Sequence, residues 1–315
     1  HKFPGELEPI FVHTGQHYDF QMSEVFFEDL GLPEPEHYLG ASNGSPAHQT
    51  AEIIDRIDPV LEAEQPDLVV VVGDVTSTPA CALAASKRDI AVAHVEAGLR
   101  SGDRRMPEEL NRLATDALSD LLFTYSADAD ENLLAENVPA ACVFRVGNLM
   151  IDTLTRMRPR AAASDILKRL DLRPREYAIA TLHRPSNVDR PEVLRGILRA
   201  FEQIQRHLPI LFQIHPRARQ RLAEFGMENE LEGMPNLRPL QPQGYLDFLR
   251  LQEGARILLT DSGGLQEEAT VLGVPCLTLR RNTERPITIE QGTNRLVGQE
   301  PGVIVSAALE ALASE

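Results

Sequence analysis

Short apolar runs of strand length recur along the whole chain, and stretches with helical periodicity separate them. A short run at residues 10–12 comes first, and the clearest runs cover residues 68–72, 91–95, 121–125, 177–182, 210–214, 256–260 and 274–278. This alternation is typical of parallel sheets whose strands are joined by crossover helices, so the sequence predicts an α/β fold. In such sheets the carboxyl ends of the strands border the ligand crevice, and polar residues there are candidates for a functional site.

The chain is long enough to form two domains. It has 315 residues, of which 43% are hydrophobic, and this is sufficient for two ordinary cores. Both periodicities are weakest over residues 156–174, where prolines and charged residues interrupt them. We therefore place the boundary at about residue 153, which gives an N-terminal domain of residues 1–153 and a C-terminal domain of residues 154–315.

The composition argues against several classes of partner. Acidic residues number 47 against 31 lysines and arginines, and the net charge of -16 repels nucleic acid and anionic membranes. The apolar runs are much shorter than the ~20 residues of a membrane-spanning helix. Cys81, Cys142 and Cys276 lack the spacing of a disulfide framework or a zinc site, which favours a reducing cytoplasm. A small anionic metabolite is still compatible, because arginines and helix N-termini act locally.

Three carboxylates lie at the ends or starts of consecutive elements in the predicted N-terminal domain. Asp74 follows the run of valines, Glu96 follows the next strand, and Glu108 lies in the first turn of a helix. Taken alone, Asp74 equally fits the N-cap of the next helix, and Glu108 fits a surface ion pair with Arg112 four residues on. Together the three indicate clustered carboxyls, whose pKa values separate and so provide a general acid and a general base.

Basic residues follow strands in the predicted C-terminal domain. His183-Arg184 and His215 each come directly after a strand, and Arg285 lies on a loop after the last of the clear runs. Histidine binds phosphate or transfers a proton near neutral pH, and the forked guanidinium of arginine suits phosphate. Either histidine alone is more often structural, but two at equivalent strand ends favour a ligand.

Residues 260–268 have the clearest local pattern, a strand end followed by a turn of small residues and a helix start. Because Gly263 and Gly264 carry no side chain, the helix amides and the Ser262 hydroxyl can approach an anion closely. Glu268, about one turn into the helix, is placed to accept ribose hydroxyls. The turn is neither a Gly-x-Gly-x-x-Gly motif nor a P-loop, so it implies neither NAD nor ATP.

Four motifs in this order resemble the non-hydrolysing UDP-N-acetylglucosamine 2-epimerases. They are Val-Glu-Ala-Gly-Leu-Arg at 95–100, Pro-Glu-Glu-Leu-Asn-Arg at 107–112, Asp-Ser-Gly-Gly-Leu-Gln-Glu-Glu-Ala at 261–269 and Thr-Glu-Arg-Pro at 283–286. The similarity runs from residue 13 to residue 298 and covers nearly the whole chain. It implies two Rossmann-like domains facing a central cleft, as in the GT-B glycosyltransferases, a homodimer, a UDP-sugar substrate, no metal and no nicotinamide cofactor.

The resemblance also implies roles for individual residues. Asp74, Glu96, Glu108 and His183 match the acid/base set of the family, and Arg112 matches a nearby arginine of the cleft. Among the substrate-binding positions, Phe248 matches the aromatic residue that stacks on uracil, and Glu268 matches the residue that contacts the ribose. The pyrophosphate contacts match Ser262, Gly263 and Gly264. Other positions of the substrate pocket match Arg184, His215 and Arg285.

The sequence departs from the family pattern at several places. An opening strand with a Gly-Thr-Arg-Pro-Glu loop and a closing helix of the family are expected outside the sequence given. Ser186 stands where the family has glutamate, and Ile287-Thr288 stands where many members have an acid, which leaves the sugar open. Tyr18-Asp19 differs from bacterial members that their own substrate regulates at a second site.

The implied reaction is reversible epimerisation at C2 of UDP-N-acetylglucosamine to UDP-N-acetylmannosamine. The C2 hydrogen is not acidic in the substrate, so we expect elimination of UDP to a glycal, followed by re-addition. Three alternatives remain at this stage. They are a 2-epimerase of another UDP-sugar of the diacetamido uronate type, a GT-B glycosyltransferase, and a catalytically silent UDP-sugar sensor.

Overall fold

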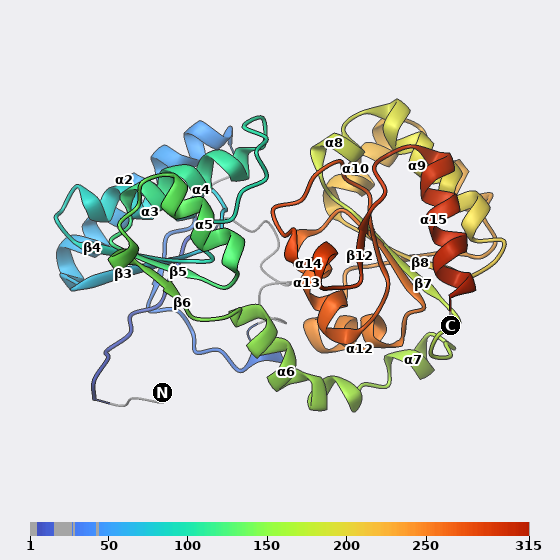
Figure 1. Cartoon of the computed structure of the whole chain (residues 1–315), viewed down its shortest axis with the longest axis horizontal. Coiled ribbons are helices and arrows are strands. Elements are labelled where there is room, and N and C mark those ends of the chain that lie inside the picture. Colours follow the sequence, from blue (N-terminus) through green and yellow to red (C-terminus); the bar gives the residue numbers. More distant parts are fainter. Residues whose placement is uncertain (1–4, 16–26, 28, 42–43, 315) are drawn as a thin grey trace. The chain divides into compact units, whose positions relative to one another are not determined.

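The computed structural model describes residues 5–15, 27, 29–41 and 44–314 (Figure 1). Contacts divide the chain into two compact units, His1–Asn148 and Leu149–Glu315. Every strand pairing within the described residues is parallel, and helices connect most consecutive strands. The predicted α/β class is therefore confirmed, with one Rossmann-like unit in each half of the chain.

The first unit contains a four-stranded sheet in the order β3-β4-β5-β6 and a separate pair, β1-β2. Its strands are β1 (Val12–His13), β2 (His37–Tyr38), β3 (Leu68–Val72), β4 (Ala91–Val95), β5 (Leu121–Thr124) and β6 (Val143–Arg145). Its helices are α2 (Pro46–Glu64), α3 (Ser77–Ser86), α4 (Pro107–Leu118), α5 (Ala127–Ala135) and the short 3-10 helix η1 (Ala140–Cys142).

The second unit contains a six-stranded sheet in the order β12-β11-β10-β7-β8-β9. Its strands are β7 (Ala178–Leu182), β8 (Ile210–Ile214), β9 (Leu237–Leu240), β10 (Ile257–Thr260), β11 (Cys276–Thr278) and β12 (Asn294–Leu296). Its helices are α6 (Leu149–Ala162), α7 (Ile166–Arg169), α8 (Pro185–Val188), α9 (Pro191–Ile204), α10 (Pro216–Glu224), α11 (Glu228–Glu232), α12 (Tyr245–Gly254), α13 (Gly263–Leu272), α14 (Ile287–Glu290) and α15 (Pro301–Ala313).

Helix α6 links the two units and packs with the second. It contacts α12 and α13, and its buried side chains include Leu154 and Met157. The predicted boundary at about residue 153 lies inside this helix, whereas along the chain the first unit ends at Asn148. Arg-Pro-Arg at 158–160 interrupts the helical pattern in the sequence, yet Pro159 stands inside the helix.

Alternate residues along the strands of the second sheet pack into two different hydrophobic cores. Along β7, Ala178, Ala180 and Leu182 join the cluster that includes side chains of α9 and α15. Ile179 faces the opposite way and joins the cluster that includes side chains of α12 and α13. Because side chains alternate across a strand, burial on both faces requires apolar residues at every position. This explains why the central strands read as unbroken apolar runs.

The order in which strands are added to the second sheet reverses at β7. Strands β8 and β9 follow on one side of β7, whereas β10, β11 and β12 follow on the other. The register pairs Thr181 with Thr260, so β7 and β10 end next to each other. A ligand in an open α/β sheet binds outside the carboxyl ends of the strands at such a switch point. The topology therefore places the residues after β7 and β10 at the expected ligand site.

The strands that the sequence did not predict are β2, β6, β9 and β12. β6, β9 and β12 lie at ends of the two sheets, and β2 belongs to the separate pair. Each has two to four residues, and β9 includes Pro239. A strand of two to four residues offers too few positions for a recognisable apolar run, whereas β3, also at a sheet end, has five apolar residues and was predicted. None of the helices in the described ranges combines the length and apolar character needed to cross a membrane.

We predict that Gly98→Ala destabilises the protein much more than Gly102→Ala. Both glycines have positive φ, +80° and +72°, and a side chain costs roughly 1–2 kcal/mol in this conformation. Only at Gly98 would the new Cβ also clash, lying 2.4 Å from the carbonyl oxygen of Ala129. Crowding of this kind adds about 1–3 kcal/mol. Urea unfolding followed by circular dichroism measures both variants, and equal losses would contradict the packing described.

Candidate active site

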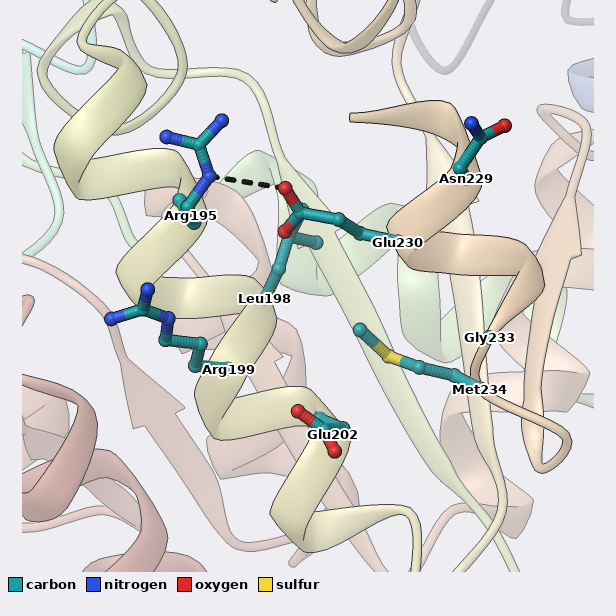
Figure 2. A pocket seen from close by; sticks show the side chains of 8 residues that line it. All are labelled: Arg195, Leu198, Arg199, Glu202, Asn229, Glu230, Gly233 and Met234. Carbon is teal, nitrogen blue, oxygen red and sulfur yellow. Dashed lines mark hydrogen bonds and ion pairs between the residues drawn. The ribbon is translucent and has the colours of Figure 1, made fainter. Parts of the chain in front are cut away.

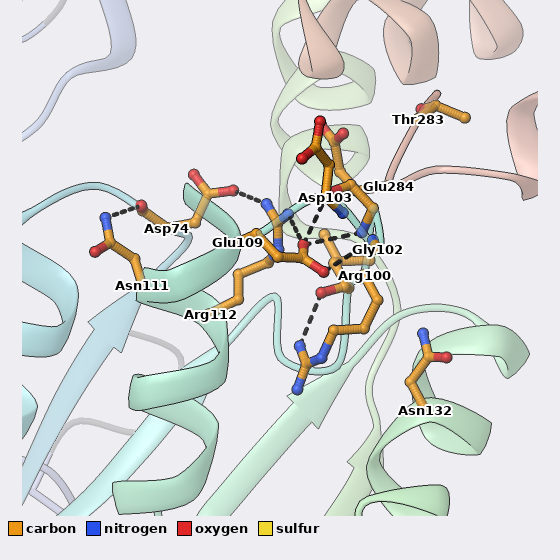
Figure 3. Close-up of polar contacts among 12 residues, drawn as sticks. Asp74, Arg100, Gly102, Asp103, Glu109, Asn111, Arg112, Asn132, Thr283 and Glu284 are labelled. Carbon is orange, nitrogen blue, oxygen red and sulfur yellow. Dashed lines mark hydrogen bonds and ion pairs between the residues drawn. The ribbon is translucent and has the colours of Figure 1, made fainter. Parts of the chain in front are cut away.

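Asp74 and Arg112 form an ion pair at the carboxyl end of the first sheet (Figure 3). Asp74 follows β3 by two residues, and its Oδ2 lies 2.5 Å from Nη1 of Arg112 on α4. Asn111 also donates from Nδ2 to the backbone oxygen of Asp74 at 2.8 Å. The alternative that Asp74 caps the next helix is wrong, because α3 has Thr76 at its N-cap. Its carboxylate is thus held by α4.

Arg112 is buried, which argues against the alternative of an ordinary surface ion pair with Glu108. Its guanidinium, with a side chain only 1% exposed, is bound by Asp74 on one side and by Glu109 on the other (Figure 3). Glu108 is half-buried in the first turn of α4, where the helix dipole favours a carboxylate. Glu109, the residue after Glu108, was not among the site residues predicted from the sequence.

Glu109 fastens a loop to the start of α4. It accepts the backbone N–H groups of Ser101 and Gly102, both at 2.9 Å, and the Ser101 hydroxyl at 3.0 Å. Burial alone would raise the pKa of Glu109, but these hydrogen bonds and the Arg112 guanidinium outweigh it and lower the pKa. The anionic side chain therefore orients both the loop and Arg112.

Glu96 has a strained backbone at the end of β4. Its φ of 69° lies in the left-handed region, which costs a non-glycine residue about 1–3 kcal/mol. The next residue, Ala97, donates its N–H to Phe123 on the neighbouring strand at 3.1 Å, so this conformation is held by the sheet. Strain of this kind concentrates at functional sites, which supports a role for the half-buried Glu96 carboxylate.

A buried pair beneath these loops joins β4 to α4. His94 Nδ1 lies 2.6 Å from Asp116 Oδ1, and His94 Nε2 lies 2.8 Å from the backbone oxygen of Gly73. Asp116 also accepts the N–H of Gly98 at 3.1 Å and pairs with Arg100 at 2.7 Å. Burial would raise the pKa of Asp116, but His94 and Arg100 lower it overall. The loops that carry Asp74 and Glu96 are thereby tied to one helix.

In the second unit, His183 and His215 lie side by side. They follow β7 and β8, and their ring centroids are 5.6 Å apart. His215 is also the N-cap of α10. Burial lowers the pKa of His215, and the neighbouring His183 lowers it further.

The turn before α13 has the features of an anion site. Ser262 is the N-cap, and it makes no side-chain capping hydrogen bond within the part of the chain that the structure describes. A Cβ at Gly263 would lie 2.3 Å from Nη1 of Arg285, so only glycine allows this guanidinium over the start of the helix. Gly264 follows, in contact range of Met150. Helix amides and an arginine thus converge on one place, as an anion requires.

Two buried glutamates hold the arginines near this turn. Glu284 pairs with Arg280 at 2.6 Å and with Arg285 at 2.5 Å, and its Oε1 lies 3.8 Å from Nη2 of Arg184. Glu267 pairs with Nε of Arg285 at 3.0 Å. Burial would raise the pKa of Glu284, but the arginines depress it far below its ordinary value. Carboxylates therefore hold the Arg285 guanidinium in place, and the Arg184 guanidinium lies close to one of them.

Glu268 and Phe248 lie on the helices behind the turn. Glu268 is buried, accepts from Gln252 Nε2 at 2.8 Å, and has its pKa raised by burial to about 6. Phe248, on α12, is half-buried and packs against the core under α12 and α13. Its expected stacking on a uracil stays a prediction.

The structure therefore groups the candidate residues within each unit. Asp74, Glu96, Glu108 and Arg112 come from elements at one end of the first sheet, and His183, Arg184, His215, Ser262, Gly263 and Arg285 from one end of the second. A cleft between the two domains stays a prediction, and Tyr18 and Asp19 lie outside the described residues.

A groove of about 510 Å³ also lies between α9 and α11 (Figure 2). Arg195 and Glu230 form a 3.0 Å ion pair across it. Its lining residues are Arg195, Leu198, Arg199, Glu202, Asn229, Glu230, Gly233 and Met234. None of the candidate residues lines this groove, so it is separate from the candidate site.

Comparison with known proteins gives one consistent family. A family model described as UDP-N-acetylglucosamine 2-epimerase matches residues 2–315. The UDP-N-acetylglucosamine 2-epimerase of Methanocaldococcus jannaschii is 44% identical over 94% of this chain and 82% of its own length. The UDP-2,3-diacetamido-2,3-dideoxy-D-glucuronate 2-epimerase of Pseudomonas aeruginosa is 40% identical over 97% of this chain and 84% of its own length.

One solved structure is similar over nearly the whole chain. It is the crystal structure of the M. jannaschii UDP-GlcNAc 2-epimerase in complex with UDP-GlcNAc and UDP, with a TM-score of 0.92 and 43% sequence identity. The match covers 96% of this chain and 85% of that chain.

We predict that Glu268→Gln stabilises the protein above pH 6. The pKa of Glu268 is raised from 4.5 to about 6 by burial, so the folded protein binds more protons than the unfolded chain between these values. The contribution of Glu268 to the free energy of unfolding therefore falls as pH rises through this window, by roughly 2 kcal/mol. Urea unfolding across a pH series measures the difference between wild type and variant.

The control is Glu232→Gln, because Glu232 is an exposed glutamate of the same unit. Its difference from wild type should not vary with pH in the same window. A pH-independent difference for Glu268→Gln would mean that its carboxyl titrates normally.

Proposed function

Because this chain belongs to the UDP-N-acetylglucosamine 2-epimerase family, we propose that it interconverts UDP-N-acetylglucosamine and UDP-N-acetylmannosamine. The observation that carries the proposal is the arrangement of the second unit, where an anion site occupies the switch point between β7 and β10. The similar M. jannaschii structure, in complex with UDP-GlcNAc and UDP, supports a UDP-sugar as the ligand.

The chemistry must activate a hydrogen that is not acidic in the substrate. Loss of UDP from C1 develops positive charge next to C2, and a carboxylate can then remove the C2 proton. The C1–O electron pair leaves with UDP, and the C2–H electron pair forms the C1=C2 double bond of a glycal. Addition of a proton to the other face of C2 and return of the UDP oxygen to C1 give the epimer.

We assign binding of UDP to the second unit. The N-terminus of α13 and the side chain of Ser262 face the pyrophosphate, and Arg184 and Arg285 supply positive charge held by Glu284. Such preorganised donors stabilise a departing anion without reorganising during the reaction. His215 adds a hydrogen-bond donor, and the absence of side chains at Gly263 and Gly264 allows the pyrophosphate to approach the helix closely. Glu268 accepts hydrogen bonds from the ribose hydroxyls, and Phe248 stacks on the uracil.

We assign proton transfer at C2 to the first unit. Asp74, Glu96 and Glu108 are the candidate acids and bases, and Arg112 orients Asp74. Carboxylates on both faces of a ring can remove a proton on one side and return it on the other. Domain closure then excludes water from the glycal. As the family resemblance implies, we propose a homodimer that needs no metal and no nicotinamide.

A second candidate substrate is a UDP-diacetamido uronate. The P. aeruginosa relative, named for that substrate, is 40% identical, close to the 44% of the M. jannaschii enzyme. The same elimination and re-addition would apply, because the second sugar also carries its acetamido group at C2. Ile287-Thr288, where many members have an acid, does not select between the two sugars.

We predict that incubation with UDP-N-acetylglucosamine in deuterated water inverts C2 and places deuterium there. Proton transfer at C2 requires exchange with solvent when the acids and bases on the two faces differ. NMR of the sugar measures both inversion and label.

The same incubation repeated with the UDP-diacetamido uronate, and then with a sugar acceptor added, identifies the alternatives. Turnover of only the diacetamido uronate would replace the proposed substrate. Transfer of the sugar to an acceptor without C2 exchange indicates a glycosyltransferase. Binding of UDP with no exchange indicates a sensor and contradicts the proposed reaction.

We predict that Asp74→Asn and Glu96→Gln each lower kcat by roughly 10²–10⁴-fold, the range of a general acid or base. UDP affinity should be retained, because both residues belong to the first unit. Steady-state kinetics and calorimetry with UDP measure the two effects. The control is Glu131→Gln, an exposed glutamate on α5. Full activity in both amide variants would remove Asp74 and Glu96 from the mechanism.

A further inference from the structure

Asp261 is a buried carboxylate at the end of β10, with no exposed surface. It accepts the backbone N–H of His183 at 3.1 Å and that of Arg184 at 3.0 Å. Asn187 donates to it from Nδ2 at 3.0 Å. Nδ1 of His183 lies 2.9 Å from its Oδ1. A single side chain thus binds both the backbone and the ring of the segment after β7.

Asn187 keeps Asp261 in place. Its Nδ2 also donates to the backbone oxygen of Leu279 at 2.9 Å, and its Oδ1 accepts from Gln299 Nε2 at 2.6 Å. The amide is therefore engaged at both ends and cannot flip without losing these bonds. The carboxylate of Asp261 is fixed in turn.

Burying a carboxylate costs free energy, and the partners of Asp261 indicate its role. Burial would raise the pKa of Asp261, yet His183 and the surrounding N–H donors lower it overall. Replacing a buried ionic group by an apolar one is often neutral or stabilising, so stability alone is a weak reason to keep it. The contacts of Asp261 point instead to the orientation of His183.

The two histidine rings have opposite hydrogen-bonding roles. An ionised carboxylate only accepts, so the proton of a neutral His183 ring lies on Nδ1 and the lone pair on Nε2. In the His215 ring the two nitrogens have the opposite roles. Its Nδ1 accepts the backbone N–H of Arg217 at 3.2 Å, so its proton lies on Nε2.

We propose that Asp261 is a positioning residue that fixes the tautomer of His183 and leaves Nε2 of that ring to accept from a ligand, beside a His215 ring that donates from Nε2. The His183 side chain is 33% exposed, so a ligand can reach it. The rings, 5.6 Å apart, present one acceptor and one donor at the switch point.

For the reaction, this inference rests on the proposed function. His215 would donate to an oxygen of the pyrophosphate throughout turnover. His183 would accept a hydrogen bond at Nε2 from a hydroxyl group of the UDP-sugar, and Asp261 holds the ring in the tautomer that this requires. A carboxylate holds a histidine in one tautomer in the same way in serine hydrolases.

The wild-type protein tests the tautomers directly. We expect ring-nitrogen NMR of histidine-labelled protein, at mildly alkaline pH, to show the proton on Nδ1 for one ring and on Nε2 for the other. Loss of individual signals in His183→Gln and His215→Gln identifies them. A His183 signal with the proton on Nε2 would overturn the proposal, and this measurement does not depend on catalysis or on any Asp261 variant folding.

The Asp261→Asn variant tests whether Asp261 fixes the tautomer of His183. We expect the fixed tautomer of His183 to be lost and kcat to fall by roughly 100-fold or more, with a smaller change in KM. The control is Asp189→Asn, because Asp189 is the next aspartate along this segment and pairs with Arg217 and Arg221 instead. It should leave the His183 signal unchanged.

Two results separate the inference from the proposed function. A folded Asp261→Asn protein with the wild-type tautomer and wild-type kcat would refute the positioning role. The expected tautomers in a wild-type protein that does not epimerise its UDP-sugar would refute the proposed reaction and leave the role of Asp261 intact.

Discussion

Buried carboxylates that accept backbone N–H groups hold the loops at the ends of both sheets. Asp261 binds the N–H groups of His183 and Arg184 in the second unit, and Asp116 and Glu109 bind loop N–H groups in the first. Each such carboxylate costs several kcal/mol to desolvate, and its hydrogen bonds and cationic partners offset this cost. Their effect is geometric, since each holds backbone N–H groups of a loop next to candidate residues.

The two units divide the charges that the proposed reaction needs. The first unit presents carboxylates at the end of its sheet, with Arg112 buried between two of them. The second presents histidines and arginines around the start of a helix, with Glu284 and Glu267 neutralising part of that charge. A chain with a net charge of -16 thus gathers positive charge locally at the start of this helix, where we propose that an anion binds.

Close packing fixes these sites as firmly as charge does. Gly263 admits the Arg285 guanidinium to the start of α13, and Gly98 admits the carbonyl of Ala129 next to the loop after β4. Glu96, two residues before Gly98, tolerates a left-handed backbone because the strand pairing on either side holds it. Rigid surroundings of this kind allow strain to persist at a site.

The sequence by itself determined the α/β class and the central strands, because strands buried on both faces must be apolar at every position. It also identified the Ser262 turn and the polar strand ends, since these follow directly from chain order. Short edge strands such as β9 were not predicted, because their few, partly solvated residues carry no such pattern.

Only the tertiary structure decided which polar side chains meet. Arg112 binds Asp74, 38 residues away in the chain, and Asp261 binds the His183 segment, 78 residues away. Glu109 anchors the loop at Ser101, a role that no local pattern indicated. Hydrogen bonds between residues so far apart depend on strand order and register, and these arise from packing of the whole sheet rather than from any local pattern.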